Sequence, residues 1–142
     1  MYKKILVPLD ASQTAQAAAE HAIALARECH AALRFLNVLD FSALVGVVPS
    51  IVQVTHGDAR LLLDDWVARA TQWGLDAGSV IAETGPEQPN VADAVVGAAA
   101  DWGADLIAIG SHGRSGVRHL VLGSVAEAVA RASSVPVLIV HP

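Results

Sequence analysis

Residues Gly110 to Val125 read GSHGRSGVRHLVLGSV, with glycines at positions 110, 113, 116 and 123. Glycine allows close approach to the backbone, and a helix that begins beside it exposes unpaired N–H groups at the positive end of its dipole. Such groups bind phosphate oxygens. The segment therefore predicts an anion or nucleotide site, although strand-to-helix turns also carry glycines for structural reasons alone. It has neither the Gly-Lys-Ser/Thr ending of a Walker loop nor a G-x-G-x-x-G pattern.

Ser124 and Glu127 indicate where the helix after this loop begins. A serine followed three residues later by glutamate is the pattern of a capping box. We therefore expect Ser124 to be the N-cap and to offer its hydroxyl to the same site.

Composition limits what kind of protein this is. The 142 residues are 54% hydrophobic and 16% charged, which favours one folded domain over residues 1–142 and argues against disorder. A net charge of −5 without runs of Lys or Arg gives no reason to expect nucleic-acid or anionic-membrane binding.

Location is expected to be cytoplasmic. Cys29 is the sole cysteine, so no intrachain disulfide forms, and its alanine-rich surroundings favour a small buried hydrophobe. The N-terminus enters a strand pattern at once, without the layout of a signal peptide. The longest uncharged run, residues 41–57, is interrupted by Gly46, Pro49 and Ser50, so no membrane span is expected.

Strand and helix patterns alternate along the chain. Apolar runs rich in branched residues predict five strands, at Lys4–Leu9, Ala32–Leu39, Ser79–Glu83, Asp105–Ile109 and Val135–Val140. Apolar residues at spacings of three and four predict four helices, from Ala15 to Cys29, Gly57 to Trp73, Val91 to Trp102 and Val125 to Arg131.

Details at the ends of the helices sharpen this prediction. Asp10 or Ser12 can cap the first helix, and Trp66 and Trp73 are expected in the core. The segment from Asp40 to about Thr55 is the least regular, and we expect a folded-over loop or a short helical turn there. The alternation predicts an α/β fold with a doubly wound parallel sheet.

The topology predicts where a ligand would bind. In open parallel sheets, ligands bind outside the carboxyl ends of the strands, where the winding reverses. If the first strand is central and the chain later crosses to the fourth, Leu9–Asp10 and Ile109–Gly110 flank that crevice. The glycine loop then lies where the fold would place a ligand.

Gly110-x-x-Gly113, nine residues, then Gly123-Ser124 resembles the ATP-binding signature of the universal stress protein family. The runs Ile5–Asp10, Leu36–Asp40 and Val135–Val140 are also similar to that family, so the resemblance covers essentially the whole chain. It implies a Rossmann-like five-stranded parallel sheet of order 3-2-1-4-5 with four helices on two faces, usually in a dimer. Some family members bind ATP, and this chain keeps every position of the signature.

The resemblance also implies which residues hold the nucleotide. Phosphates and ribose would lie on Gly110, Gly113, Gly123 and Ser124, with a further N–H from Val125. The adenosine end would be lined by Pro8, Leu9 and Asp10, and the main chain of Val38 would meet the adenine. Arg114 is a candidate phosphate partner because a guanidinium grips oxyanions bidentately.

Asp10 would repel phosphates unless Mg²⁺ intervened, so we expect it to contact ribose hydroxyls or the adenine amino group, or to serve as an N-cap alone. Mg²⁺ would be carried mainly by the phosphates of ATP. His112 and His119 lie seven apart without a third ligand in register, which is a poor metal site, and no metal ligands are assigned.

Together with the agreement between loop and topology, the resemblance implies an ATP-binding, stress-responsive regulatory protein, with no catalytic residue assigned. A slow ATPase or phosphotransferase remains the alternative, with Asp10 and His112 as the candidate groups. A scaffold that keeps the loop as structure alone is a third. Because the uncharged strand Val135–Val140 would lie at a sheet edge, we expect an antiparallel homodimer through it. Protein partners are not identified by the residues.

Overall fold

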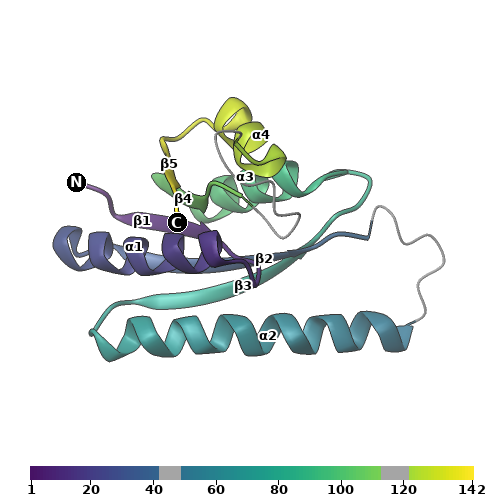
Figure 1. Ribbon diagram of the computed structural model, residues 1–142, viewed down its shortest axis with the longest axis horizontal. Coiled ribbons are helices and arrows are strands. Elements are labelled where there is room, and N and C mark those ends of the chain that lie inside the picture. The colour runs from purple at the N-terminus through teal and green to yellow at the C-terminus, as the bar shows by residue number, and fades with distance from the viewer. Residues whose placement is uncertain (42–48, 113–121) are drawn as a thin grey trace.

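A computed structural model describes residues 1–41, 49–112 and 122–142 of the chain (Figure 1). Strands and helices alternate along it. Their bounds are β1 (Lys4–Pro8), α1 (Gln13–Cys29), β2 (Ala32–Leu39), α2 (Pro49–Gln72), β3 (Ala77–Glu83), α3 (Val91–Trp102), β4 (Leu106–Gly110), α4 (Ser124–Ala132) and β5 (Val137–Val140).

The strands form one parallel sheet in the order β3-β2-β1-β4-β5, so the predicted strand order is confirmed. β1 lies at the centre, and the chain crosses from β3 at one edge to β4 on the other side of β1. The C-terminal ends of β1 and β4 therefore flank the point where the winding reverses.

Helices cover both faces of the sheet, because successive strand residues point to opposite sides. Ile5 and Val7 of β1 face the cluster beneath α1 and α2, whereas Leu6 faces the cluster beneath α3 and α4. All three side chains have no exposed surface.

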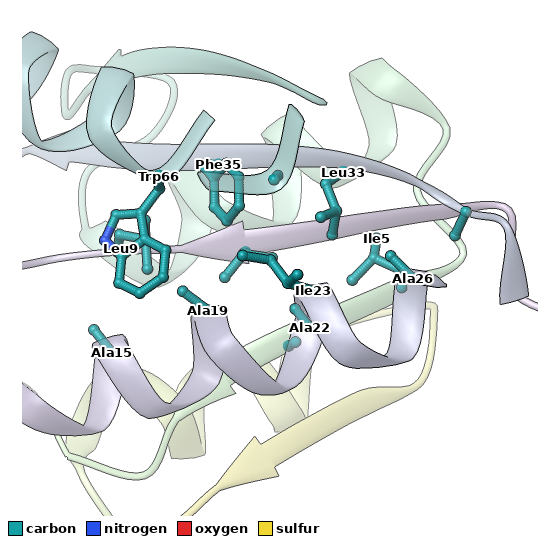
Figure 2. Packing of buried hydrophobic residues seen from close by; sticks show 14 of the residues in the cluster. Ile5, Leu9, Ala15, Ala19, Ala22, Ile23, Ala26, Leu33, Phe35 and Trp66 are labelled. Atoms are coloured by element: carbon teal, nitrogen blue, oxygen red, sulfur yellow. The ribbon is translucent and has the colours of Figure 1, made fainter. Parts of the chain in front are cut away.

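α1 packs closely on the sheet because its buried face consists mainly of alanines (Figure 2). Ala19, Ala22 and Ala26 are completely buried beneath the strands. Small side chains bring a helix axis near the sheet, so backbone atoms of α1 and β4 come into contact. That close approach shapes the site described below.

α2 begins earlier than expected. The segment from Asp40 to Thr55 was expected to be irregular, with a helix from near Gly57, but the helix starts at Pro49. Proline suits a first helical position because its fixed φ is already helical and its missing N–H would have no intrahelical acceptor. Residues 42–48 of that segment lie outside the described residues.

The two tryptophans near the end of α2 have different environments. Trp66 is 3% exposed and contacts Phe35 at 6.2 Å between ring centroids, as expected for a core residue. Trp73 is 58% exposed, so its predicted core position is wrong. It follows the last helical residue, and the Arg27 guanidinium covers its ring at 3.7 Å from the centroid.

No helix within the described ranges is both long and apolar enough to cross a membrane.

Candidate functional site

A pocket of about 360 Å³ lies at the C-terminal ends of β1, β2 and β4, beside the start of α4. The structure brings together around it most of the residues predicted from the sequence. These are Pro8, Leu9, Asp10, Val38, Gly110, Gly123, Ser124 and Val125. Gly113 and Arg114 lie outside the described residues, as does His119.

Sequence reasoning did not assign several polar residues that also line the pocket, namely Ser12, Asp40 and Ser111. His112 lines it as well and was considered only as a candidate base or metal ligand. Asp40 and Ser111 each directly follow the last residue of a strand. Their position at the C-terminal strand ends is the signal that could have identified them.

Ser12, not Asp10, is the N-cap of α1. Its hydroxyl accepts the N–H of Ala15 at 3.2 Å, while Asp10 Oδ1 accepts the N–H of Ser12 at 2.8 Å. Asp10 therefore supports the turn into α1 and still faces the pocket.

Leu9 lies in the wall of the pocket and is held from β2. Its N–H donates to the Leu36 carbonyl at 2.7 Å, and the Asn37 side-chain amide donates to its carbonyl at 2.8 Å. The side chain of Leu9 is 5% exposed. The wall at the end of β1 is thus fixed within the protein.

The turn after β4 is bonded to three other elements. The Ser111 N–H donates to the Val140 carbonyl of β5 at 2.9 Å, and the Ser111 carbonyl accepts the N–H of Gly123 at 2.7 Å. The hydroxyl of Thr14, in α1, donates to the carbonyl of His112. Ser111 has no exposed surface, and its hydroxyl lies 2.9 Å from His112 Nδ1.

The N-terminus of α4 contributes backbone donors. Gly123 is the N-cap, and no side chain among the described residues caps this end. The first intrahelical bond runs from the Glu127 N–H to the Gly123 carbonyl at 2.9 Å. The N–H groups of Ser124 and Val125 precede it and so have no intrahelical acceptor. Both residues line the pocket, where the positive end of the helix dipole favours an anion.

Two expectations about this end are corrected. Ser124 is the first helical residue rather than the N-cap, and Glu127 bonds to Arg131 at 2.5 Å instead of completing a capping box. The amide of Gly123 is already used by Ser111, so it is not available to a ligand. The donors that remain are those of the first helical turn.

Gly110 and Gly123 have different reasons to be glycine. A Cβ at position 110 would lie 2.6 Å from the Thr14 carbonyl carbon and 2.7 Å from its carbonyl oxygen, so packing alone demands glycine there. Gly123 has φ −61° and ψ 151°, which any residue can adopt. Its conformation therefore does not require glycine.

Charge is unevenly distributed around the pocket. The carboxylates of Asp10 and Asp40 follow β1 and β2, whereas the start of α4 lies beyond β4. Neighbouring strands are about 4.8 Å apart, so the ends of β2 and β4 are separated by roughly 10 Å. The pocket thus has carboxylate acceptors at one end and backbone donors of a helix N-terminus at the other. Over the described ranges, no group of three His, Cys, Asp or Glu residues could hold a metal ion.

Comparison with known proteins gives matches along nearly the whole chain. The family model described as the universal stress protein family matches residues 1–141. Universal stress protein MJ0531 of Methanocaldococcus jannaschii is 33% identical, over 99% of this chain and 82% of its own. A structure from the same family from Burkholderia pseudomallei is 36% identical, with a TM-score of 0.81, covering 98% of this chain and 96% of the other.

A further solved structure contains a nucleotide. It is a universal stress protein in complex with cAMP, 26% identical to this chain, with a TM-score of 0.74. The match covers 99% of this chain and 97% of the other.

Proposed function

Because the chain belongs to the universal stress protein family, we propose that it binds ATP in this pocket and acts as a nucleotide-dependent regulatory module in a stress response. The observation that carries the proposal is the start of α4, where Ser124 and Val125 line a pocket at the topological switch point and have backbone N–H groups without an intrahelical acceptor. The cAMP complex of a similar protein supports a nucleotide as the class of ligand.

The two ends of the pocket suggest the orientation of the ligand. The adenosine would lie against Pro8, Leu9 and Asp10, with the adenine at the main chain of Val38. Its amino group and ribose hydroxyls are donors, which suits the carboxylate end. The phosphates would lie at Gly110, Gly123, Ser124 and Val125, with Gly113 and Arg114 as further partners.

Mg²⁺ would be carried mainly by the phosphates. The two carboxylates that line the pocket, Asp10 and Asp40, follow β1 and β2 and would thus stand at the adenosine end. A bound divalent cation would neutralise phosphate charge and reduce repulsion from them. It would change the net charge of the ligand without needing a cage of protein ligands.

Regulation would follow from occupancy. ATP that binds one conformation better than another shifts the population toward it, and so alters the surface offered to a partner. A cytoplasmic location is proposed with this function, because ATP is available there and a lone half-buried Cys29 suits a reducing compartment.

The direct test is nucleotide analysis of the purified protein after heat extraction, followed by calorimetric titration with Mg-ATP. Saturable binding of ATP is expected. Absence of both bound nucleotide and binding heat at millimolar Mg-ATP would refute the proposal.

Ser124→Asp tests the phosphate end specifically. An acidic residue in the first turn suits the helix dipole, so α4 should remain folded, yet its charge would repel phosphates. At about 4 Å and an effective dielectric constant near 20, like charges cost roughly 4 kcal/mol, so a loss of ATP affinity of at least about tenfold is expected. Gln72→Glu is the control, because it adds one negative charge at the far end of α2. Equal ATP affinity in the two variants would contradict the assigned orientation.

A phosphate-release assay with Mg-ATP decides the enzymatic alternative. Asp10 and His112 both line the pocket, which is the observation that favours a slow ATPase or phosphotransferase. Phosphate release above background that is abolished by Asp10→Ala, with ATP binding retained, would establish that alternative. Release no faster than background would dismiss it.

We also propose a homodimer through the C-terminal strand, expected from the sequence over Val135–Val140. β5 occupies an edge of the sheet. The carbonyls of Pro136 and Val140 accept N–H groups from Ile107 and Ser111, so these alternate residues face β4. The N–H and C=O of Val137 and Ile139 then point away from the sheet. An antiparallel copy of β5 would satisfy them.

A further inference from the structure

Thr14 is a buried polar residue that does not line the pocket. It lies in the first turn of α1 and is 7% exposed. Its neighbours Ser12 and Ala15 line the pocket, whereas Thr14 faces the end of β4. A buried hydroxyl must be hydrogen-bonded, so its partners indicate what it does.

A chain of hydrogen bonds runs from α1 through Thr14 to the turn after β4. The Thr14 hydroxyl donates its proton to the His112 carbonyl. Its oxygen lies 3.4 Å from Ser12 Oγ, which must then be the donor in that contact. Ser12 Oγ also accepts the Ala15 N–H. Bonds in such a series polarise and strengthen one another.

Packing holds the same two segments together. Because Gly110 has no Cβ, the backbone and hydroxyl of Thr14 approach it, and a Cβ there would lie 2.7 Å from the Thr14 hydroxyl oxygen. α1 and the end of β4 are therefore joined by direct contact at Gly110 and by the hydrogen bond to His112 two residues later.

We propose that Thr14 is a positioning residue for the phosphate end of the site. Through the His112 carbonyl it fixes the turn at Ser111–His112, and the Ser111 carbonyl in turn holds the N–H of Gly123, the N-cap of α4. Thr14 thus sets where the N–H groups of Ser124 and Val125, which have no intrahelical acceptor, stand relative to the rest of the pocket, without touching the ligand. This inference rests on the proposed ATP site.

The positioning role of Thr14 should affect the binding of phosphates but not that of adenosine. Phosphates would contact the start of α4, whereas adenosine would contact the ends of β1 and β2, which are held by other bonds, such as that from Asn37 to Leu9. Loss of the Thr14 hydroxyl should therefore weaken the binding of ATP and leave the binding of adenosine unchanged. A merely structural role would not change the ratio of the two affinities.

The test compares Thr14→Val, Thr14→Ser and Thr71→Val in calorimetric titrations with Mg-ATP and with adenosine. Thr71 is the matched control, because its hydroxyl donates to the Ala68 carbonyl at 3.0 Å near the far end of α2. A single hydrogen bond is worth about 1 kcal/mol, so Thr14→Val should weaken ATP binding about fivefold. Thr14→Ser and Thr71→Val should stay within about twofold of the parent affinity, since neither loses that bond.

An unchanged ratio of ATP to adenosine affinity in Thr14→Val would overturn the inference. If the parent protein bound neither ligand, the proposed function would fail, and amide hydrogen exchange would then decide the positioning role separately. Thr14→Val should speed exchange at the Ser111 and Gly123 amides relative to Thr71→Val. Equal exchange at these amides in the two variants would show that Thr14 does not hold the turn.

Discussion

Replacing Gly110 with alanine tests whether this glycine serves packing or the ligand. The added Cβ would lie 2.6 Å from the Thr14 carbonyl carbon and 2.7 Å from its carbonyl oxygen, whereas carbon atoms pack best at about 3.5–4.0 Å. To bring this contact to the lower end of that range, α1 and β4 must move apart by roughly 1 Å. Thr14 cannot yield alone, because Ala15, Ala18 and Ala19 beside it are buried.

The cost follows from the general behaviour of overpacked cores. Inserting a methyl group into a well-packed region costs about 1–3 kcal/mol. In a domain of this size, 1 kcal/mol lowers Tm by about 3 °C, so Gly110→Ala should melt roughly 3–9 °C below the parent. Since total stabilities are about 5–15 kcal/mol, the variant should still fold.

The assay is thermal and urea denaturation followed by circular dichroism, with Gly78→Ala as the control. Gly78 also lies in a strand, but a Cβ there would meet nothing within 4 Å. The free energy of unfolding of Gly78→Ala should differ from that of the parent by less than about 0.5 kcal/mol, as for substitutions at positions without close packing. Gly110→Ala with the parent's stability but without ATP binding would refute the packing argument and assign this glycine to the ligand.

Three further variants test the caps and the edge strand. Ser12→Ala should cost about 1 kcal/mol in urea denaturation because it removes the cap bond to Ala15, whereas Ser124→Ala should cost less than about 0.5 kcal/mol because Ser124 makes no cap bond. A loss of about 1 kcal/mol in Ser124→Ala would reinstate it as a cap. Val137→Pro removes an N–H that points away from β4, so sedimentation should show a folded monomer where the parent is a dimer. A parent that sediments as a monomer at micromolar concentration would contradict the dimer, and a variant that stays dimeric would move the interface elsewhere.

The spacing of apolar residues along the chain predicted several strands and helices with nearly their observed bounds. The strand Ala32–Leu39 was predicted with its observed bounds, and the helix at Val91–Trp102 was also found. Short runs of branched apolar residues are typical of the strands of a parallel sheet that helices cover on both faces. Together with the family resemblance, they were sufficient for the strand order, and the order then located the pocket.

Tertiary structure decided which residue caps α4 and which of the predicted core residues are buried. Ser124 has the sequence of a capping box, but the bond from Gly123 to the Ser111 carbonyl makes Gly123 the N-cap. Trp73 has core spacing, but the helix ends before it and its ring remains exposed. The N-cap cannot be read from the neighbours of Ser124, because the bond from Gly123 goes to Ser111, twelve residues earlier.

Gly110 illustrates the difference most clearly. Its type and place in a glycine series predicted a residue of the nucleotide site, and it does line the pocket. Its lack of a side chain is nevertheless required by Thr14, nearly a hundred residues earlier in the chain. Spacing along the chain determined which residues gather at the ends of the strands. The close approach of α1 to β4, which exists only in the folded protein, decided what each of them does there.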